Sequence, residues 1–176
     1  GIDHILNRDE ELVKIAFDEL KKIPALHILA GNIEQRLGAI SFYVENIHYN
    51  LIVKLLNDRF GVQVRGGCSC AGTYGHYLLH VDPNHSKIIT DKIDQGDLSE
   101  KPGWVRMSIH PTMTDAELNT AINGIAQIVE NIDGWSNDYI YDKSKNEFFN
   151  KNDDGSELNK IKSWFAISQH QTVQVD

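Results

Sequence analysis

The sequence predicts an α+β protein, a two-layer sandwich with a small, mainly antiparallel sheet and helices packed on one face. Two observations lead to this class. Apolar residues recur at helical spacing in three stretches, and short segments that are β-rich or that alternate between apolar and polar residues lie between them. The 41% apolar and 24% charged residues of this 176-residue chain are typical of a soluble globular domain.

The first part of the chain is expected to contain two of the three main helices. Apolar spacing predicts one helix over about 9–22 and another over about 51–60. Asn46 is the expected N-cap of the second helix, and Gly61 stands where a helix-terminating glycine belongs. The strands predicted in this part are 26–30, 38–44 and 62–64.

The third main helix is the most strongly marked element. Thr114 and Glu117 form a capping box, and apolar residues then recur at helical spacing to Val129. Before it, residues 104–109 alternate as a strand does. A short helix is expected at 76–81, and residues 83–103 form a polar insertion with one helical turn around 88–93.

The character of the sequence changes after Gly134. Residues 139–142 and 147–150 are expected to pair as a hairpin, and a short amphipathic helix is expected around residues 158–165. We therefore expect one domain over residues 1–134, which includes the insertion, and a C-terminal extension over residues 135–176.

Charge and cysteine content exclude several classes of function. The net charge of −8 argues against nucleic acid or an anionic membrane as a partner, and no apolar run approaches the roughly 18 residues of a membrane-spanning helix. Cys68 and Cys70 lie too close for an unstrained disulfide, which favours a reducing, cytoplasmic location. Because the chain begins at Gly1 without methionine, we expect it to be processed, tagged or cut from a longer protein.

A glycine-rich loop follows the predicted strand 62–64. Residues 65–75 contain four glycines, which indicates irregular backbone held close to another part of the molecule. Arg65 and the loop amides would lower the pKa of a neighbouring thiol and make it a nucleophile. Two alternatives remain open: the cysteines are buried packing residues, or a zinc site forms. The zinc site would use Cys68, Cys70, His76 and His80.

Arg106 is the second candidate functional residue. On the alternating strand it shares a face with Ser108, opposite to Val105 and Met107. A guanidinium group there would hold a carboxylate through two parallel hydrogen bonds. The alternative is an arginine at the sheet edge that faces solvent.

These motifs together resemble the C-terminal small domain of class V aminotransferase-fold enzymes, which include cysteine desulfurases and selenocysteine lyases. The residues that carry the resemblance are the segments 65–71 and 104–108 and the capped helix from Thr114. The resemblance implies pyridoxal phosphate as cofactor, an amino-acid substrate and a homodimeric full-length enzyme. It matches Cys70 to the persulfide-forming nucleophile and Arg106 to the arginine that holds the substrate carboxylate.

The sequence departs from the family pattern at several positions of the loop. Cys68 and Ser69 stand where histidines are common, and Gly72 and Thr73 stand where Gln-Pro is common. The site loop is therefore taken as Gly66, Gly67, Cys68, Ser69, Gly72 and Thr73, with Arg65 as a second substrate-binding residue. Desulfuration, transamination, epimerisation and elimination all remain open as reactions.

The features of a cofactor site are not found in this sequence. In this family the lysine that forms the Schiff base commonly follows a histidine, and none of the eight histidines here is followed by lysine. We therefore expect the C-terminal, substrate-binding part of a larger enzyme whose N-terminal pyridoxal-phosphate domain is missing. Alone, this chain should bind no cofactor and show no activity. The alternative is a free-standing thiol or zinc-binding module.

Overall fold

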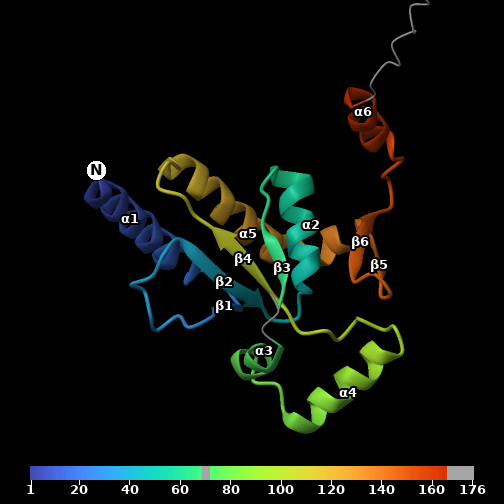
Figure 1. Cartoon of the computed structure of the whole chain (residues 1–176). Coiled ribbons are helices and arrows are strands. Elements are labelled where there is room, and N and C mark those ends of the chain that lie inside the picture. Colours follow the sequence, from blue (N-terminus) through green and yellow to red (C-terminus); the bar gives the residue numbers. More distant parts are fainter. Residues whose placement is uncertain (69–71, 166–176) are drawn as a thin grey trace, which may run out of the picture.

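The computed structural model describes residues 1–68 and 72–165, and its α+β class agrees with the prediction (Figure 1). The helices are α1 (Ile2–Leu20), α2 (Tyr49–Phe60), α3 (Gly72–Leu78), α4 (Pro83–Asp94), α5 (Asp115–Trp135) and α6 (Ser156–Trp164), with a 3-10 turn at Ser136–Asp138. The strands are β1 (Leu26–Ile28), β2 (Ala39–Val44), β3 (Arg65–Gly67), β4 (Trp104–Ser108), β5 (Tyr139–Asp142) and β6 (Glu147–Asn150).

The main sheet has the strand order β1-β2-β4-β3, and every neighbouring pair is antiparallel. Because side chains alternate along a strand, each strand presents one set of residues to the core and the other to the opposite face. Ile40 and Phe42 of β2 and Val105 and Met107 of β4 are buried in the core. Ser41 and Arg106 therefore belong to the opposite face.

Helices α1, α2 and α5 cover the core face of the sheet. Phe17, Leu55 and Ile125, one from each helix, are fully or almost fully buried in one cluster with the strand residues. In α5 the predicted capping box is present: the Glu117 backbone N–H donates to Thr114 Oγ1 at 3.2 Å, and the Thr114 N–H donates to Glu117 Oε2 at 2.8 Å. No helix in the described part of the chain is long and apolar enough to cross a bilayer.

Two helix starts differ from the prediction. Helix α1 begins at Ile2 rather than near residue 9, and its first two turns are exposed, with Ile2, Ile5 and Leu6 outside the core. Helix α2 is capped by His48, not by Asn46. The His48 Nδ1 accepts the Asn50 backbone N–H at 3.1 Å, whereas Asn46 adopts a left-handed turn with φ 61°.

The predictions for the third strand and for the start of the next helix were wrong. Residues 62–64 belong to no strand, and strand β3 occupies Arg65–Gly67, inside the segment predicted to be irregular. Helix α3 likewise begins at Gly72, earlier than residue 76. Glycine is tolerated in β3 because β4 supplies the partner strand and because Gly66 packs directly on helix α2, where a side chain would not fit.

The insertion contains more structure than the sequence indicated, whereas the C-terminal part agrees with the prediction. Helix α4 covers twelve residues, starting at Pro83 with Asp82 as its cap, a combination that favours a helix start. The hairpin β5–β6 has the predicted bounds. It packs on α2, where the Tyr139 hydroxyl donates to Asp58 Oδ2 at 3.1 Å and Arg59 pairs with Asp138 at 2.6 Å.

Candidate functional site

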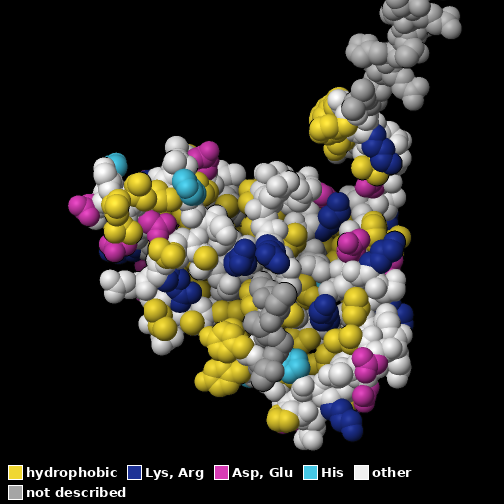
Figure 2. All heavy atoms as spheres, viewed as in Figure 1, with side chains coloured by type: hydrophobic (Ala, Val, Ile, Leu, Met, Phe, Trp, Pro, Cys, Tyr) yellow, Lys and Arg dark blue, Asp and Glu magenta, His cyan; other side chains and the backbone are white. Residues whose placement is uncertain are grey.

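The face of the sheet opposite the core carries a row of three polar residues across β2, β4 and β3. In the sheet register, Arg106 lies opposite Ser41 on one side and opposite Arg65 on the other. Figure 2 shows basic side chains gathered over the middle of this face. Like charges directly opposite each other on a sheet repel, so the row is a place where an anion would be stabilising.

The Arg106 side chain has an unsatisfied hydrogen-bond donor. It is half-buried, and its Nε is fully buried without a hydrogen-bond partner among the residues that the structure describes. A buried N–H group left unpaired costs about 1–3 kcal/mol, more if it is charged. A carboxylate or phosphate oxygen would satisfy it. The predicted role of Arg106 as an anion fork is compatible with this geometry, and Arg65, which is exposed, faces the same position.

The predicted nucleophile lies outside the described residues. Cys68, half-buried, follows directly after β3, whereas Ser69 and Cys70 belong to the segment 69–71. Gly67 has φ 118°, a conformation that favours glycine, and it turns the chain out of β3 toward this segment. Gly72 and Thr73, the other predicted loop residues, form the start of α3.

Helix α3 packs on the same face of the sheet, against Trp104. A Cβ atom at Gly75 would lie 3.2 Å from the Trp104 ring and 3.7 Å from the Cys68 Cβ, so glycine permits this close approach. The Trp104 side chain is buried as a result, with 5% exposure. The expectation of backbone held close to another part of the molecule is confirmed at Gly66 and Gly75.

Tyr49 lies beneath the site on the core side of the sheet. A Cβ atom at Gly66 would approach its ring to 3.1 Å, and one at Gly103 would overlap it. Burial raises the pKa of the Tyr49 phenol, and the hydrogen bond from Asn146 offsets part of that rise. Sequence reasoning missed Tyr49, because glycines at 66 and 103 indicate a close approach without identifying the residue approached.

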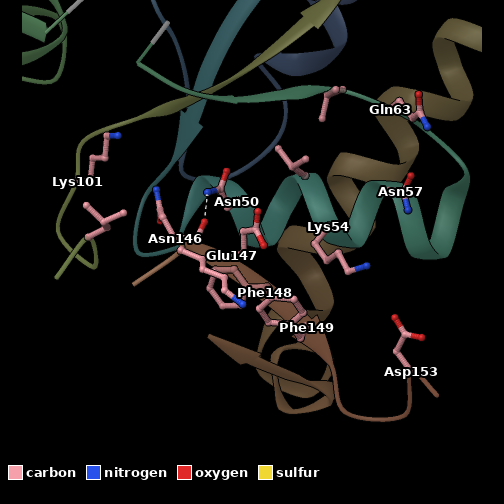
Figure 3. Close-up of a pocket in the computed structure, with 14 residues that line it drawn as sticks. Asn50, Lys54, Asn57, Gln63, Lys101, Asn146, Glu147, Phe148, Phe149 and Asp153 are labelled. Atoms are coloured by element: carbon pink, nitrogen blue, oxygen red, sulfur yellow. Dashed lines mark hydrogen bonds between the residues drawn. The ribbon is translucent and has the colours of Figure 1, made fainter. Parts of the chain in front are cut away.

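A separate groove of about 750 Å³ lies between α2, residues 63–64, the end of the insertion and the hairpin (Figure 3). Lys54, Lys101 and Lys145 are among its lining residues, together with Phe148 and Phe149. Neither arginine of the row nor Cys68 lines it. The groove is therefore distinct from the candidate site predicted from the sequence.

The proposed zinc ligands are placed in different surroundings. His76 Nδ1 lies 2.8 Å from Ser86 Oγ of helix α4, and His80 is exposed with φ 53°. Cys70, the central ligand of the motif, lies outside the described residues. Within residues 1–68 and 72–165 no group of three or more His, Cys, Asp or Glu side chains is arranged to hold a metal ion.

Arg65 and Arg106 are suited to bind the anionic groups of pyridoxal phosphate or of its substrate. The lysines of this chain are not suited to anchor the cofactor covalently. A Schiff-base lysine is held beside the cofactor in a desolvated pocket. All twelve lysines lie in the described part of the chain, and none is buried. The most enclosed include Lys54, which pairs with Asp58 at 3.1 Å, and Lys92, which pairs with Glu100.

Comparison with known proteins identifies a matching family and relatives of similar sequence or fold. The family model for aminotransferase class-V matches residues 1–120. A probable cysteine desulfurase from Xylella fastidiosa (strain Temecula1 / ATCC 700964) is 37% identical over 71 residues, which are 40% of this chain and 17% of that protein. The chain thus spans about a sixth of the length of this relative.

Solved structures of cysteine desulfurases are similar in fold. The enzyme from Thermococcus onnurineus NA1 matches with a TM-score of 0.50 at 21% identity, over 74% of this chain and 27% of that one. CsdA from Escherichia coli has a TM-score of 0.49 at 17% identity, over 74% and 26%. The family match over residues 1–120 confirms the resemblance seen in the sequence. This chain belongs to the aminotransferase class-V family.

Proposed function

We propose that this chain is the substrate-binding part of a pyridoxal-phosphate-dependent class V enzyme that acts on an α-amino acid. In this proposal residues 1–134 form the small domain and residues 135–176 an extension. The cofactor and its lysine belong to a separate pyridoxal-phosphate-binding part, with which this chain forms a cytoplasmic, homodimeric enzyme. The absence of a buried lysine supports the division, since no lysine here suits a Schiff base.

The observation that carries the proposal is the buried Nε of Arg106, which has no hydrogen-bond partner within residues 1–68 and 72–165, on a residue in register with Arg65. A planar guanidinium group binds a carboxylate through two parallel hydrogen bonds, and each charge-assisted bond contributes about 1.5–3 kcal/mol. An α-carboxylate held there would satisfy the unpaired donor and neutralise part of the repulsion between the two arginines. Ser41, on the other side of Arg106, offers a further hydroxyl group.

The reaction we propose is desulfuration, with Cys70 as the acceptor of the substrate's sulfur. The motif that places Cys70 after Arg65 and Gly67 supports this assignment. The Cys70 thiolate would attack the sulfur of the substrate, the carbon–sulfur bond would break, and a persulfide would remain on Cys70. The electron pair of that bond would remain on the substrate carbon, which would then take up a proton, and pyridoxal phosphate held by the other part would supply the electron-withdrawing group that stabilises this charge.

The anion fork is testable on the chain itself by NMR. We expect L-alanine, an amino acid without a reactive side chain, to shift the Arg106 Nε–Hε signal saturably, and methylammonium, which has no carboxylate, to leave it unchanged. Arg106→Lys should abolish the response. Arg59→Lys should retain it, because Arg59 is already paired with Asp138 at 2.6 Å. A response that survives Arg106→Lys, or no saturable response, would place the amino acid elsewhere.

A further inference from the structure

We propose that the hairpin β5–β6 positions the arginine-bearing strands β3 and β4 through Asn146 and Tyr49. The hairpin lies outside residues 1–120, which match the family model, so this positioning is a property of the extension. The inference rests on the proposed function in one respect: it takes the row formed by Ser41, Arg106 and Arg65 to be the substrate-binding site.

Asn146 connects the hairpin to the first turn of α2. Its side-chain Nδ2 donates to the Tyr49 hydroxyl at 2.6 Å, and its Oδ1 accepts the Tyr141 hydroxyl at 2.9 Å. Its backbone carbonyl accepts Asn50 Nδ2 at 2.6 Å, the bond drawn in Figure 3. Asn146 is buried and has φ 58°, a left-handed conformation that asparagine tolerates better than most residues. Its polar side-chain atoms are therefore all engaged.

The first turn of α2 in turn supports the two site strands. The Tyr49 ring lies against Gly103, which precedes β4, and against Gly66 of β3. Asn50 Oδ1 also contacts the position that a Gly66 side chain would occupy. Since Gly66 follows Arg65 directly and lies opposite Val105, a movement of this turn displaces the backbone that carries both arginines. The bond from Asn146 holds the Tyr49 ring in place.

Other bonds hold the hairpin without reaching the site. Tyr139 donates to Asp58, and Arg59 pairs with Asp138, both near the C-terminal end of α2. These contacts stabilise the docking of the hairpin but touch neither Gly66 nor Gly103. They provide a matched control, because their loss weakens the same interface away from the arginines.

Three variants separate positioning from general stabilisation. Asn146→Gly keeps the left-handed backbone and the carbonyl that accepts from Asn50, and it removes only the two side-chain hydrogen bonds. Asn146→Asp restores both, since its carboxylate accepts one hydrogen bond from the Tyr49 hydroxyl, which then donates, and another from the Tyr141 hydroxyl. Tyr139→Phe removes one hairpin–α2 bond at the other end of the helix.

The measurement is amide hydrogen exchange by mass spectrometry on this chain, without cofactor or substrate. In Asn146→Gly we expect exchange of the segment 62–68 to accelerate about tenfold relative to the segment 39–44, as the loss of two hydrogen bonds suggests. Asn146→Asp should restore protection, and Tyr139→Phe should leave the ratio unchanged. An equal change in Tyr139→Phe, a uniform change across both segments, or failure of the aspartate to rescue would overturn the proposal. Because no activity is measured, these outcomes are independent of whether the proposed reaction is correct.

Discussion

Arg65 and Arg106 lie directly opposite each other on the antiparallel strands β3 and β4. Two guanidinium groups in this relationship repel, and among the described residues neither one forms an ion pair. The arrangement therefore makes the free chain less stable than it could be and makes anion binding more favourable.

Removal of one charge should stabilise the free chain. We expect Arg65→Gln to raise the free energy of unfolding by up to about 1 kcal/mol at low ionic strength, because the cross-strand repulsion is lost. The gain should shrink in high salt, which screens exposed charges. Urea unfolding at two ionic strengths measures both. A destabilised variant would mean that Arg65 makes a favourable contact outweighing the repulsion.

The two cysteines should differ in function. In the enzyme assembled with its pyridoxal-phosphate-binding part, we expect Cys70→Ser to abolish sulfide release from L-cysteine and Cys68→Ser to retain much of it, because a serine hydroxyl cannot form a persulfide. Sulfide release and trapping of the protein persulfide by alkylation are the measurements. Equal activity of Cys70→Ser and wild type would eliminate desulfuration while leaving the family assignment intact.

The isolated chain should not form a Schiff base with the cofactor. With no buried lysine to hold it, we expect no aldimine absorption band when the chain is mixed with near-stoichiometric pyridoxal phosphate. Borohydride reduction followed by peptide mapping is the check. A single lysine modified stoichiometrically would show that this chain contains a complete cofactor site.

Stability should fall as the pH drops through the titration of His48. Burial lowers the pKa of His48 below its usual 6.5, so the unfolded chain binds the proton more readily than the folded chain. The contribution of neutral His48 to the free energy of unfolding is therefore complete above pH 6.5, and it is lost as the pH falls below that value. Protonation also removes the Nδ1 acceptor that caps α2, and loss of such a cap costs about 1 kcal/mol.

A cap residue that does not titrate separates the pH dependence caused by His48 from that caused by the other seven histidines. Asparagine caps helices well, so His48→Asn should keep α2 capped and show a smaller loss of stability than wild type between pH 7.5 and pH 5.5. Urea unfolding at both pH values gives the comparison. Identical pH dependence in the two proteins would contradict a titrating role for His48.

The close packing under the site should make Gly66 intolerant of a side chain. In Gly66→Ala the new methyl group overlaps Asn50 Oδ1 and approaches Val53, and we expect a loss of about 1–3 kcal/mol of stability. Gly134→Ala is the matched control: nothing lies within 4 Å of its added methyl group in helix α5, so alanine should stabilise by up to about 1 kcal/mol. Thermal unfolding of both variants should therefore move in opposite directions.

Local sequence signals were sufficient to predict helix α5, strand β4 and the hairpin β5–β6. The capping box at Thr114 and the apolar spacing after it predict α5 from residues within a few turns of one another. The alternation over 104–109 predicts β4 and puts Arg106 on the face away from Val105 and Met107. The hairpin over 139–150 likewise depends on adjacent segments. In each case the residues that determine the structure are close in the chain.

The sequence by itself determined the fold class, the family and the side of the strand on which Arg106 lies. Only the tertiary structure decided that Arg65 belongs to a strand, that it faces Arg106, and that Tyr49 supports both strands from below. Glycine is depleted in strands, and residues 65–67 pair because β4 lies beside them and α2 packs against Gly66. Such a pairing depends on contacts between segments some forty residues apart, which no local pattern records.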